Sequence, residues 1–104
     1  MITAIVQFKL PQSITLDEAK EKFQGTAPKY QGVSGLIRKY YLFEPDDTVI
    51  GVYLWEDREA AEAFYSDDWR QFLVDTYGAE PDVRYYETPV VVDNTSKEII
   101  VEAA

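Results

Sequence analysis

The chain has 104 residues, 46% of them hydrophobic, and carries 19 acidic against 10 basic side chains for a net charge of −9. A surface of this sign repels phosphate backbones and anionic lipids, which argues against nucleic acid or a membrane as a partner. Cysteine and histidine are both absent, which removes disulfides, thiolate nucleophiles and the usual zinc sites.

The first predicted element is a strand over residues 2–10. It is rich in β-branched and aromatic side chains and ends at Pro11. The start of the chain lacks the basic segment and apolar core of a signal peptide, and no stretch approaches the ~20 apolar residues of a membrane span. We therefore expect a cytoplasmic protein that forms a single domain, residues 1–104.

A helix is predicted next. Thr15 and Glu18 have the spacing of a capping box, in which each side chain satisfies a free backbone amide at the helix start. Apolar side chains then recur every three or four residues, which indicates one packed and one solvated face. Because Pro28 lies inside this pattern, we expect a bend or a new helical turn from Thr26.

A β-hairpin is predicted over residues 36–43 and 48–56, with a loop between the two strands. Alternate side chains of a strand face opposite sides of the sheet, so Leu54 and Trp55 point in opposite directions. Both are large and apolar. The pattern therefore indicates a sheet that is buried on both faces.

The second strand of the hairpin changes within two residues into an amphipathic helix that begins near Arg58. Ser66 or Asp67 is placed to cap a further helical segment. Gly78 stands in the position favoured just after a helix end, so this second helical region is predicted to close there.

The remaining chain predicts a last strand or strand pair over residues 83–88 and 89–92, then a polar turn and an apolar tail at residues 99–101. The order β-α-β-β-α-β is the α+β, ferredoxin-like arrangement: a four-stranded antiparallel sheet with two helices on one face. We expect the uncovered apolar face to close against a second copy in a homodimer. The C-terminal extension, residues 95–104, either adds a strand to the partner or is disordered.

The stretches Gly35–Leu42 and Gly51–Tyr65, followed by Trp69 and Pro89–Asn94, resemble the YdhR-like monooxygenases of the dimeric α+β barrel superfamily. The resemblance covers nearly the whole chain. It implies a small apolar pocket between the helices and the sheet of each subunit. It also implies one of several activities: oxidation of polycyclic phenols without metal or flavin, haem degradation, or lactone isomerisation. Haem-degrading members rely on a histidine, which this chain lacks.

A cofactor-free oxygenase needs little from its side chains, because the substrate supplies the electrons and the protein supplies positioning, a proton acceptor and a dry site. Arg38 and Lys39 are strand neighbours, so only one of them can enter a pocket under the helices. We predict Arg38 and Tyr40, which share a face, as the catalytic residues. The predicted substrate-binding residues are five aromatic side chains: Tyr53, Trp55, Phe64, Trp69 and Phe72.

The expected function is therefore that of a cofactor-independent monooxygenase-like enzyme acting on a small hydrophobic aromatic or polyketide-like substrate. Glu56 and Glu87, at strand ends, are alternative bases. Two other functions stay open: a binding module for a hydrophobic metabolite, and a structural dimer without a ligand. An enzyme needs a cavity of about 300 Å³ or more with a convergent polar group, whereas a filled interior favours the structural dimer.

Overall fold

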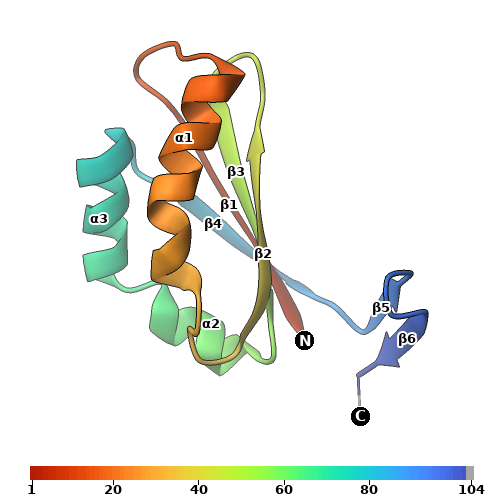
Figure 1. Ribbon diagram of the computed structural model, residues 1–104. Helices are drawn as coiled ribbons and strands as arrows, with labels where there is room; N and C mark the ends of the chain where they lie inside the picture. The colour runs from red at the N-terminus through yellow and green to blue at the C-terminus, as the bar shows by residue number, and fades with distance from the viewer. Residues whose placement is uncertain (103–104) are drawn as a thin grey trace.

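The computed structural model describes residues 1–102 and shows a four-stranded sheet with helices on one face and a separate C-terminal hairpin (Figure 1). The strands of the main sheet are β1 (Ile2–Lys9), β2 (Leu36–Phe43), β3 (Thr48–Trp55) and β4 (Asp82–Glu87). Their spatial order is β2-β3-β1-β4, and all neighbours are antiparallel. The ferredoxin-like prediction is confirmed. Residues 103 and 104, at the end of the expected extension, lie outside the described part of the chain.

The helical layer consists of α1 (Leu16–Thr26), the 3₁₀ turn η1 (Ala27–Tyr30), α2 (Arg58–Phe64) and α3 (Asp67–Tyr77). Thr15 and Glu18 form the predicted capping box. The new helical turn predicted from Thr26 is η1, which begins at Ala27 directly after the end of α1. Ser66 caps α3, and Gly78 ends it in the left-handed conformation that glycine adopts without strain. No helix within residues 1–102 is long and apolar enough to cross a membrane.

The core lies between the helices and one face of the sheet. Alternate side chains of β1 are buried beneath the helices: Ile2, Ala4, Val6 and Phe8. Tyr53 and Trp55 of β3 continue this layer, and both are almost completely buried. The Trp55 indole nitrogen donates a hydrogen bond to the Tyr65 hydroxyl at 3.0 Å. Because this buried polar group has a partner, the large ring is accommodated without the cost of an unsatisfied donor.

A β-bulge near the start of β2 changes which side chains face the helices. Leu36 pairs with Trp55, but the next paired residue is Arg38, opposite Leu54, so Ile37 is the extra residue. An extra residue in one strand shifts the alternation by one position. Leu36 and Lys39 consequently face the helices, although simple alternation from Leu36 would have turned Arg38 inward.

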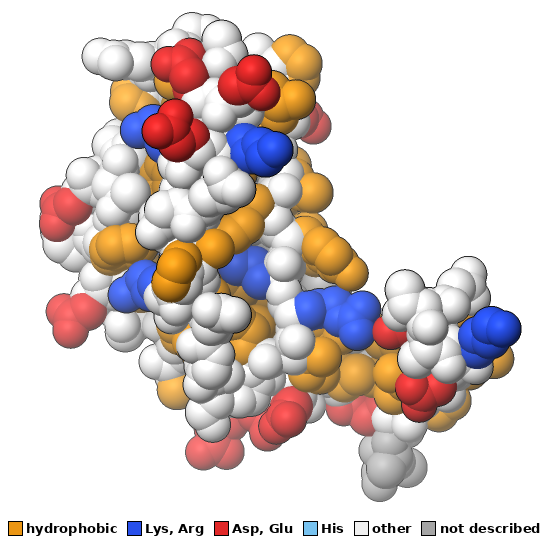
Figure 2. Space-filling model, viewed as in Figure 1, with side chains coloured by type: hydrophobic (Ala, Val, Ile, Leu, Met, Phe, Trp, Pro, Cys, Tyr) orange, Lys and Arg blue, Asp and Glu red, His pale blue; other side chains and the backbone are white. Residues whose placement is uncertain are grey.

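The C-terminal strands β5 (Val90–Asp93) and β6 (Glu98–Val101) form their own hairpin. It projects from the end of β4 as an arm that stands clear of the body (Figure 1). Figure 2 shows apolar side chains along the edge of the body that faces this arm. The alternative of a disordered tail is wrong for residues 98–101, because they pair with β5 of the same chain. Addition of this segment to a partner's sheet stays a prediction.

Candidate active site

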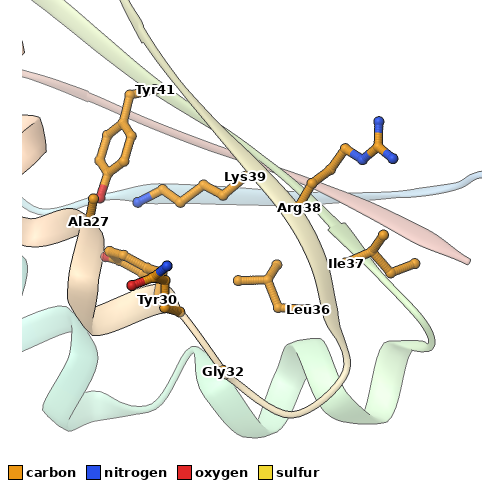
Figure 3. Close-up of a pocket in the computed structure, with 9 residues that line it drawn as sticks. Ala27, Tyr30, Gly32, Leu36, Ile37, Arg38, Lys39 and Tyr41 are labelled. Carbon is orange, nitrogen blue, oxygen red and sulfur yellow. The ribbon is translucent and has the colours of Figure 1, made fainter. Parts of the chain in front are cut away.

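A pocket of about 350 Å³ lies between η1 and the beginning of β2 (Figure 3). Tyr30 and Gly32 contribute from the helical side, and Leu36, Lys39 and Tyr41 contribute from the strand. In Figure 3 the side chains of Lys39 and Tyr41 extend toward η1. The space therefore has aromatic and aliphatic walls and one amine, and its volume exceeds the ~300 Å³ that a small-molecule site needs.

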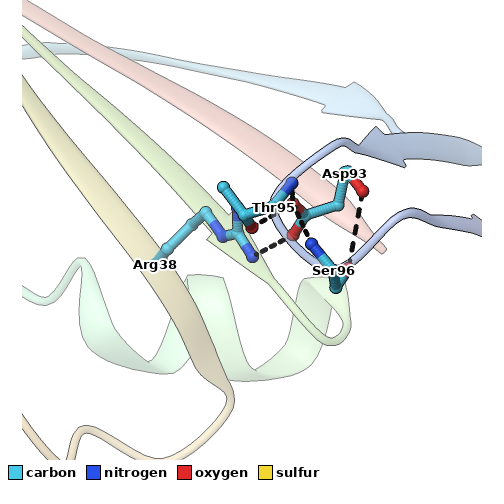
Figure 4. A network of polar contacts seen from close by, with 4 residues as sticks. All are labelled: Arg38, Asp93, Thr95 and Ser96. Atoms are coloured by element: carbon cyan, nitrogen blue, oxygen red, sulfur yellow. Dashed lines mark hydrogen bonds and ion pairs between the residues drawn. The ribbon is translucent and has the colours of Figure 1, made fainter.

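Arg38 and Tyr40 lie on the other face of the sheet. The Tyr40 side chain is 52% exposed there, and Arg38 points away from the pocket (Figure 3). The Arg38 guanidinium instead donates to the Asp93 carboxylate at 3.2 Å, joining the hairpin arm to β2 (Figure 4). Arg38 lines the edge of the pocket and Tyr40 is not among its lining residues, so their role as a catalytic pair stays a prediction, and neither is the side chain that extends beneath the helices. Lys39 takes that place.

Asp93 organises the arm as well as binding Arg38. Its carboxylate accepts hydrogen bonds from Thr95 and from the backbone amide of Ser96 (Figure 4). The bonds from Thr95, together with that from Arg38, lower the pKa of Asp93 to about 2. The contact of Arg38 is therefore a structural link between sheet and arm.

The Lys39 amine is surrounded by aromatic rings. Its Nζ lies 3.4 Å from the ring centre of Tyr30, 3.7 Å from that of Tyr41 and 4.7 Å from that of Tyr53. The hydrogen bonds and ion pairs found among residues 1–102 do not include this amine. Burial lowers the pKa of Lys39 to about 6. The ring faces attract the ammonium form, but more weakly than a paired carboxylate would, so burial still lowers the pKa of Lys39.

Two of the tyrosine hydroxyls around Lys39, those of Tyr41 and Tyr77, are bound to Thr26. The Thr26 hydroxyl lies 2.9 Å from the Tyr41 hydroxyl and 3.4 Å from the Tyr77 hydroxyl, and it donates to the Phe23 carbonyl. A hydroxyl has a single proton to donate, so both tyrosines must donate to Thr26. Burial raises the pKa of Tyr41 to about 12, and it raises that of Tyr77 as well. The amine therefore faces neutral rings.

A small void of about 20 Å³ continues behind Lys39 toward β1 and α3, which is room for one water molecule. Tyr53 forms one wall. Its ring passes so close to Gly51 that a Cβ there would lie 2.8 Å from the ring. Glycine at this position therefore allows Tyr53 to occupy its place beside the amine.

The five aromatic residues predicted to bind substrate fall into two groups. Tyr53 lines the void beside Lys39. Trp55, Phe64 and Trp69 pack together with Tyr65 beneath α2 and α3, with neighbouring ring centres 4.7 to 6.1 Å apart. The interior is therefore filled at this end of the sheet. Phe72 is half-buried on α3, where its ring contacts the Lys29 amine.

Sequence reasoning missed Tyr30 and Tyr41 as pocket residues. Tyr30 was visible only as the last member of the apolar stripe of the first helix, and the alternation of β2 alone did not reveal the direction of Tyr41. The alternative bases Glu56 and Glu87 are both exposed at their strand ends. Among residues 1–102, no group of three acidic side chains is close enough to hold a metal ion.

Comparison with known proteins identifies the fold. No protein-family model matches the chain, and no curated protein matches it either. Among solved structures, it is similar to the monooxygenase from the gene ActVA-Orf6 of Streptomyces coelicolor in complex with nanaomycin D. That match has a TM-score of 0.64 and 20% sequence identity, and it covers 84% of this chain and 86% of the other.

Two further structures support the same assignment. SnoaB, a cofactor-independent oxygenase from Streptomyces nogalater, matches with a TM-score of 0.61 and 16% identity over 84% of this chain and 91% of its own. A MhuD variant with two manganese protoporphyrin IX molecules bound per active site matches with a TM-score of 0.67 and 16% identity, over 90% of this chain and 100% of its own. The chain thus has the fold of the antibiotic biosynthesis monooxygenases. The narrower resemblance to YdhR-like proteins stays a prediction.

Proposed function

We propose that the protein is a cytoplasmic, cofactor-independent monooxygenase-like enzyme that oxidises a small hydrophobic aromatic or polyketide-like substrate. The observation that carries this proposal is the Lys39 amine, which has no partner among residues 1–102 and faces an aromatic-walled pocket of about 350 Å³. The fold supports it, since the same fold occurs in a cofactor-independent oxygenase. A binding module with the same pocket is the alternative.

The pocket supplies what such an oxidation requires. A phenolic hydroxyl placed at Lys39 gives its proton to the neutral amine, and the resulting anion is electron-rich enough to reduce O₂. An activated CH₂ group of the substrate becomes C=O, and the second oxygen atom leaves as water, so the substrate provides all the electrons. The ammonium formed at Lys39 then stabilises the anion electrostatically, and the apolar lining around Leu36 holds the hydrophobic body of the substrate.

We expect the wild-type protein to consume O₂ when a hydroxyanthrone is added. Lys39→Met should lower kcat about 100-fold or more, since a positioned base contributes at least that much. The wild-type rate should rise as the pH passes about 6, where the amine becomes neutral. An oxygen electrode measures both. Lys29→Met, which alters an exposed lysine outside the pocket, is the control. If the protein binds the anthrone but O₂ uptake is no faster than in buffer alone, the protein is a binding module and the oxidation proposal is wrong.

We also propose a homodimer formed through the uncovered face of the sheet. Ile5, Val52 and Leu54 are partly buried in the centre of this face, and Tyr40 and Tyr86 lie at its edges, 52% and 51% exposed. The hairpin arm projects on this side with further apolar side chains, among them Ile99, which is 71% exposed. An apolar face of this kind is complemented by a second copy about a two-fold axis.

Val52→Glu should convert a dimer into a monomer, because two facing copies would each bury an unpaired carboxylate at the centre of the interface. Analytical ultracentrifugation at micromolar concentration measures the change, from twice 12.0 kDa to the single chain mass. Gln7→Glu, on the same face but at an already exposed polar position, should leave the dimer intact. A wild-type monomer under these conditions would contradict the proposal.

A further inference from the structure

Lys39 differs from every other lysine of the chain in its surroundings. Lys9, Lys20, Lys22, Lys29 and Lys97 are exposed, whereas Lys39 is partly buried and lines both the pocket and the small void behind it. Its amine is in contact with ring faces and has no acceptor among residues 1–102. A group of this kind is free to react with a molecule that enters the pocket.

We propose that Lys39 captures aromatic aldehydes and related carbonyl compounds in this pocket as a Schiff base. The lone pair of Nζ attacks the carbonyl carbon while the C=O π electrons move to oxygen, and a proton passes from nitrogen to that oxygen. The carbinolamine then loses water, forming C=N. No electron is gained or lost overall, so the reaction needs neither O₂ nor a cofactor and goes beyond the oxidation proposed above.

The groups that face Lys39 favour a reactive amine. The titratable ones are tyrosines, Tyr30 from η1, Tyr41 from β2, Tyr53 from β3 and Tyr77 from α3, while β1 contributes only apolar side chains. No carboxylate lines the pocket or the void. Arg38, the next residue along the strand, points to the other face. The amine is consequently not held in an ion pair, and water in the open pocket can carry the protons that imine formation moves.

The same surroundings select the carbonyl compound. The Lys39 amine itself covers the faces of the Tyr30 and Tyr41 rings, so the apolar surface open to a ligand comes from the edges of these rings and from Leu36. A neutral aromatic aldehyde can lie against this apolar lining with its carbonyl carbon at Nζ, whereas a keto acid would bring a carboxylate against it at a desolvation cost. The expected class is therefore a neutral aromatic carbonyl compound.

Selectivity at neutral pH follows from the neutral fraction of each amine. A pKa of about 6 leaves most of Lys39 unprotonated at pH 7, while an exposed lysine with a pKa of about 10.4 is neutral in roughly one molecule in 2,500. The aldehyde has to enter the pocket to reach Lys39, which reduces the advantage in labelling rate over exposed lysines. We therefore expect at least about 10-fold preference for Lys39 over any exposed lysine at pH 7, narrowing as the pH approaches 10.

The test is reductive trapping. The full chain is incubated anaerobically with 2-naphthaldehyde and cyanoborohydride at pH 7, then digested and mapped by mass spectrometry, with the α-amine of Met1 counted separately. We expect the naphthylmethyl group at Lys39 about 10-fold above Lys29, its loss in Lys39→Arg, and no change in Lys29→Arg. Circular dichroism confirms that both variants are folded.

Equal labelling of Lys39 and Lys29 in the native protein would overturn the proposal, as would a preference that does not fall between pH 7 and pH 10. Labelling of Lys39 by formaldehyde but not by 2-naphthaldehyde would overturn the aromatic class, because the amine would then be reactive but closed to rings. Since trapping is anaerobic, failure of O₂ uptake and failure of carbonyl capture are separate results.

Discussion

Lys39→Met should raise the free energy of unfolding at pH 7 by about 4 to 5 kcal/mol. The folded chain holds the Lys39 amine at a pKa of about 6, whereas in the unfolded chain the pKa is about 10.4, and each unit of difference corresponds to about 1.36 kcal/mol. Between these pH values the unfolded state binds the extra proton, which favours unfolding. Methionine has a similar length and no charge to desolvate, and the aromatic surroundings suit its thioether.

The gain in stability should depend on pH in a defined direction. The folded-state pKa is lowered, so the wild type gains stability as the pH rises from about 6 to about 10, and the difference from Lys39→Met closes over that window. Below about pH 6 the difference should be constant. The raised pKa values of the tyrosines change the stability of the wild type and of Lys39→Met equally, so they cancel in the difference between the two proteins. Urea denaturation at pH 6, 7, 8.5 and 10 measures this.

The exposed Lys29 provides the matched control, because Lys29→Met removes the same charge from the surface. Its effect on the free energy of unfolding should stay within about 0.5 kcal/mol at every pH. A difference between wild type and Lys39→Met that is flat from pH 6 to pH 10 would show that Lys39 keeps its proton in the folded state. The oxidation and carbonyl-capture proposals would then both lose their neutral amine.

The local signals in the sequence were sufficient for the elements of the fold. The capping box at Thr15, the proline at position 28 and the glycine at position 78 each act within one helical turn, so they are visible without knowledge of the rest of the chain. The pairing of residues 90–93 with 98–101 was not predicted. It depends on a turn and a register between two short apolar segments, each of which alone could equally have paired with another chain.

The site was predicted less well than the fold, because alternation pairs Arg38 with Tyr40 and Lys39 with Tyr41 but does not show which pair faces the helices, and the bulge at Ile37 removes the guide that Leu36 would give. Alternation along β2 assigns side chains to faces only if no residue is inserted, and nothing in the Leu36–Arg38 stretch marks an insertion. The aromatic residues illustrate a second limit. Trp55 and Tyr53 lie two residues apart on one strand face, yet the first is in filled core and the second beside a void. Which space stays open depends on packing, and residue type does not report it.

Trp55→Ala should lower the free energy of unfolding by about 4 kcal/mol, the cost of removing a large buried ring from a core that cannot collapse around the cavity. Trp55 is 0% exposed, and its ring lies 5.5 Å from that of Phe64 and 5.6 Å from that of Tyr65. Trp55→Phe keeps much of the volume but removes the indole N–H that binds Tyr65, so it should cost about 1 to 2 kcal/mol. Urea denaturation at pH 7 measures both variants.

Variants of the hydrogen bond between Trp55 and Tyr65 test the packing beneath α2 and α3 without altering Lys39. Tyr65→Phe leaves the buried Trp55 N–H without its acceptor, which should cost about 1 to 3 kcal/mol. In the double variant with Trp55→Phe the two losses should be less than additive, since both partners of one hydrogen bond are gone. The cluster contacts Tyr30 and Tyr53 but not the Lys39 amine, so Trp55→Phe should leave the trapping preference at Lys39 unchanged. A loss below 1 kcal/mol for Trp55→Ala would mean that the end beneath α2 and α3 is loosely filled, and a substrate site there would again have to be considered.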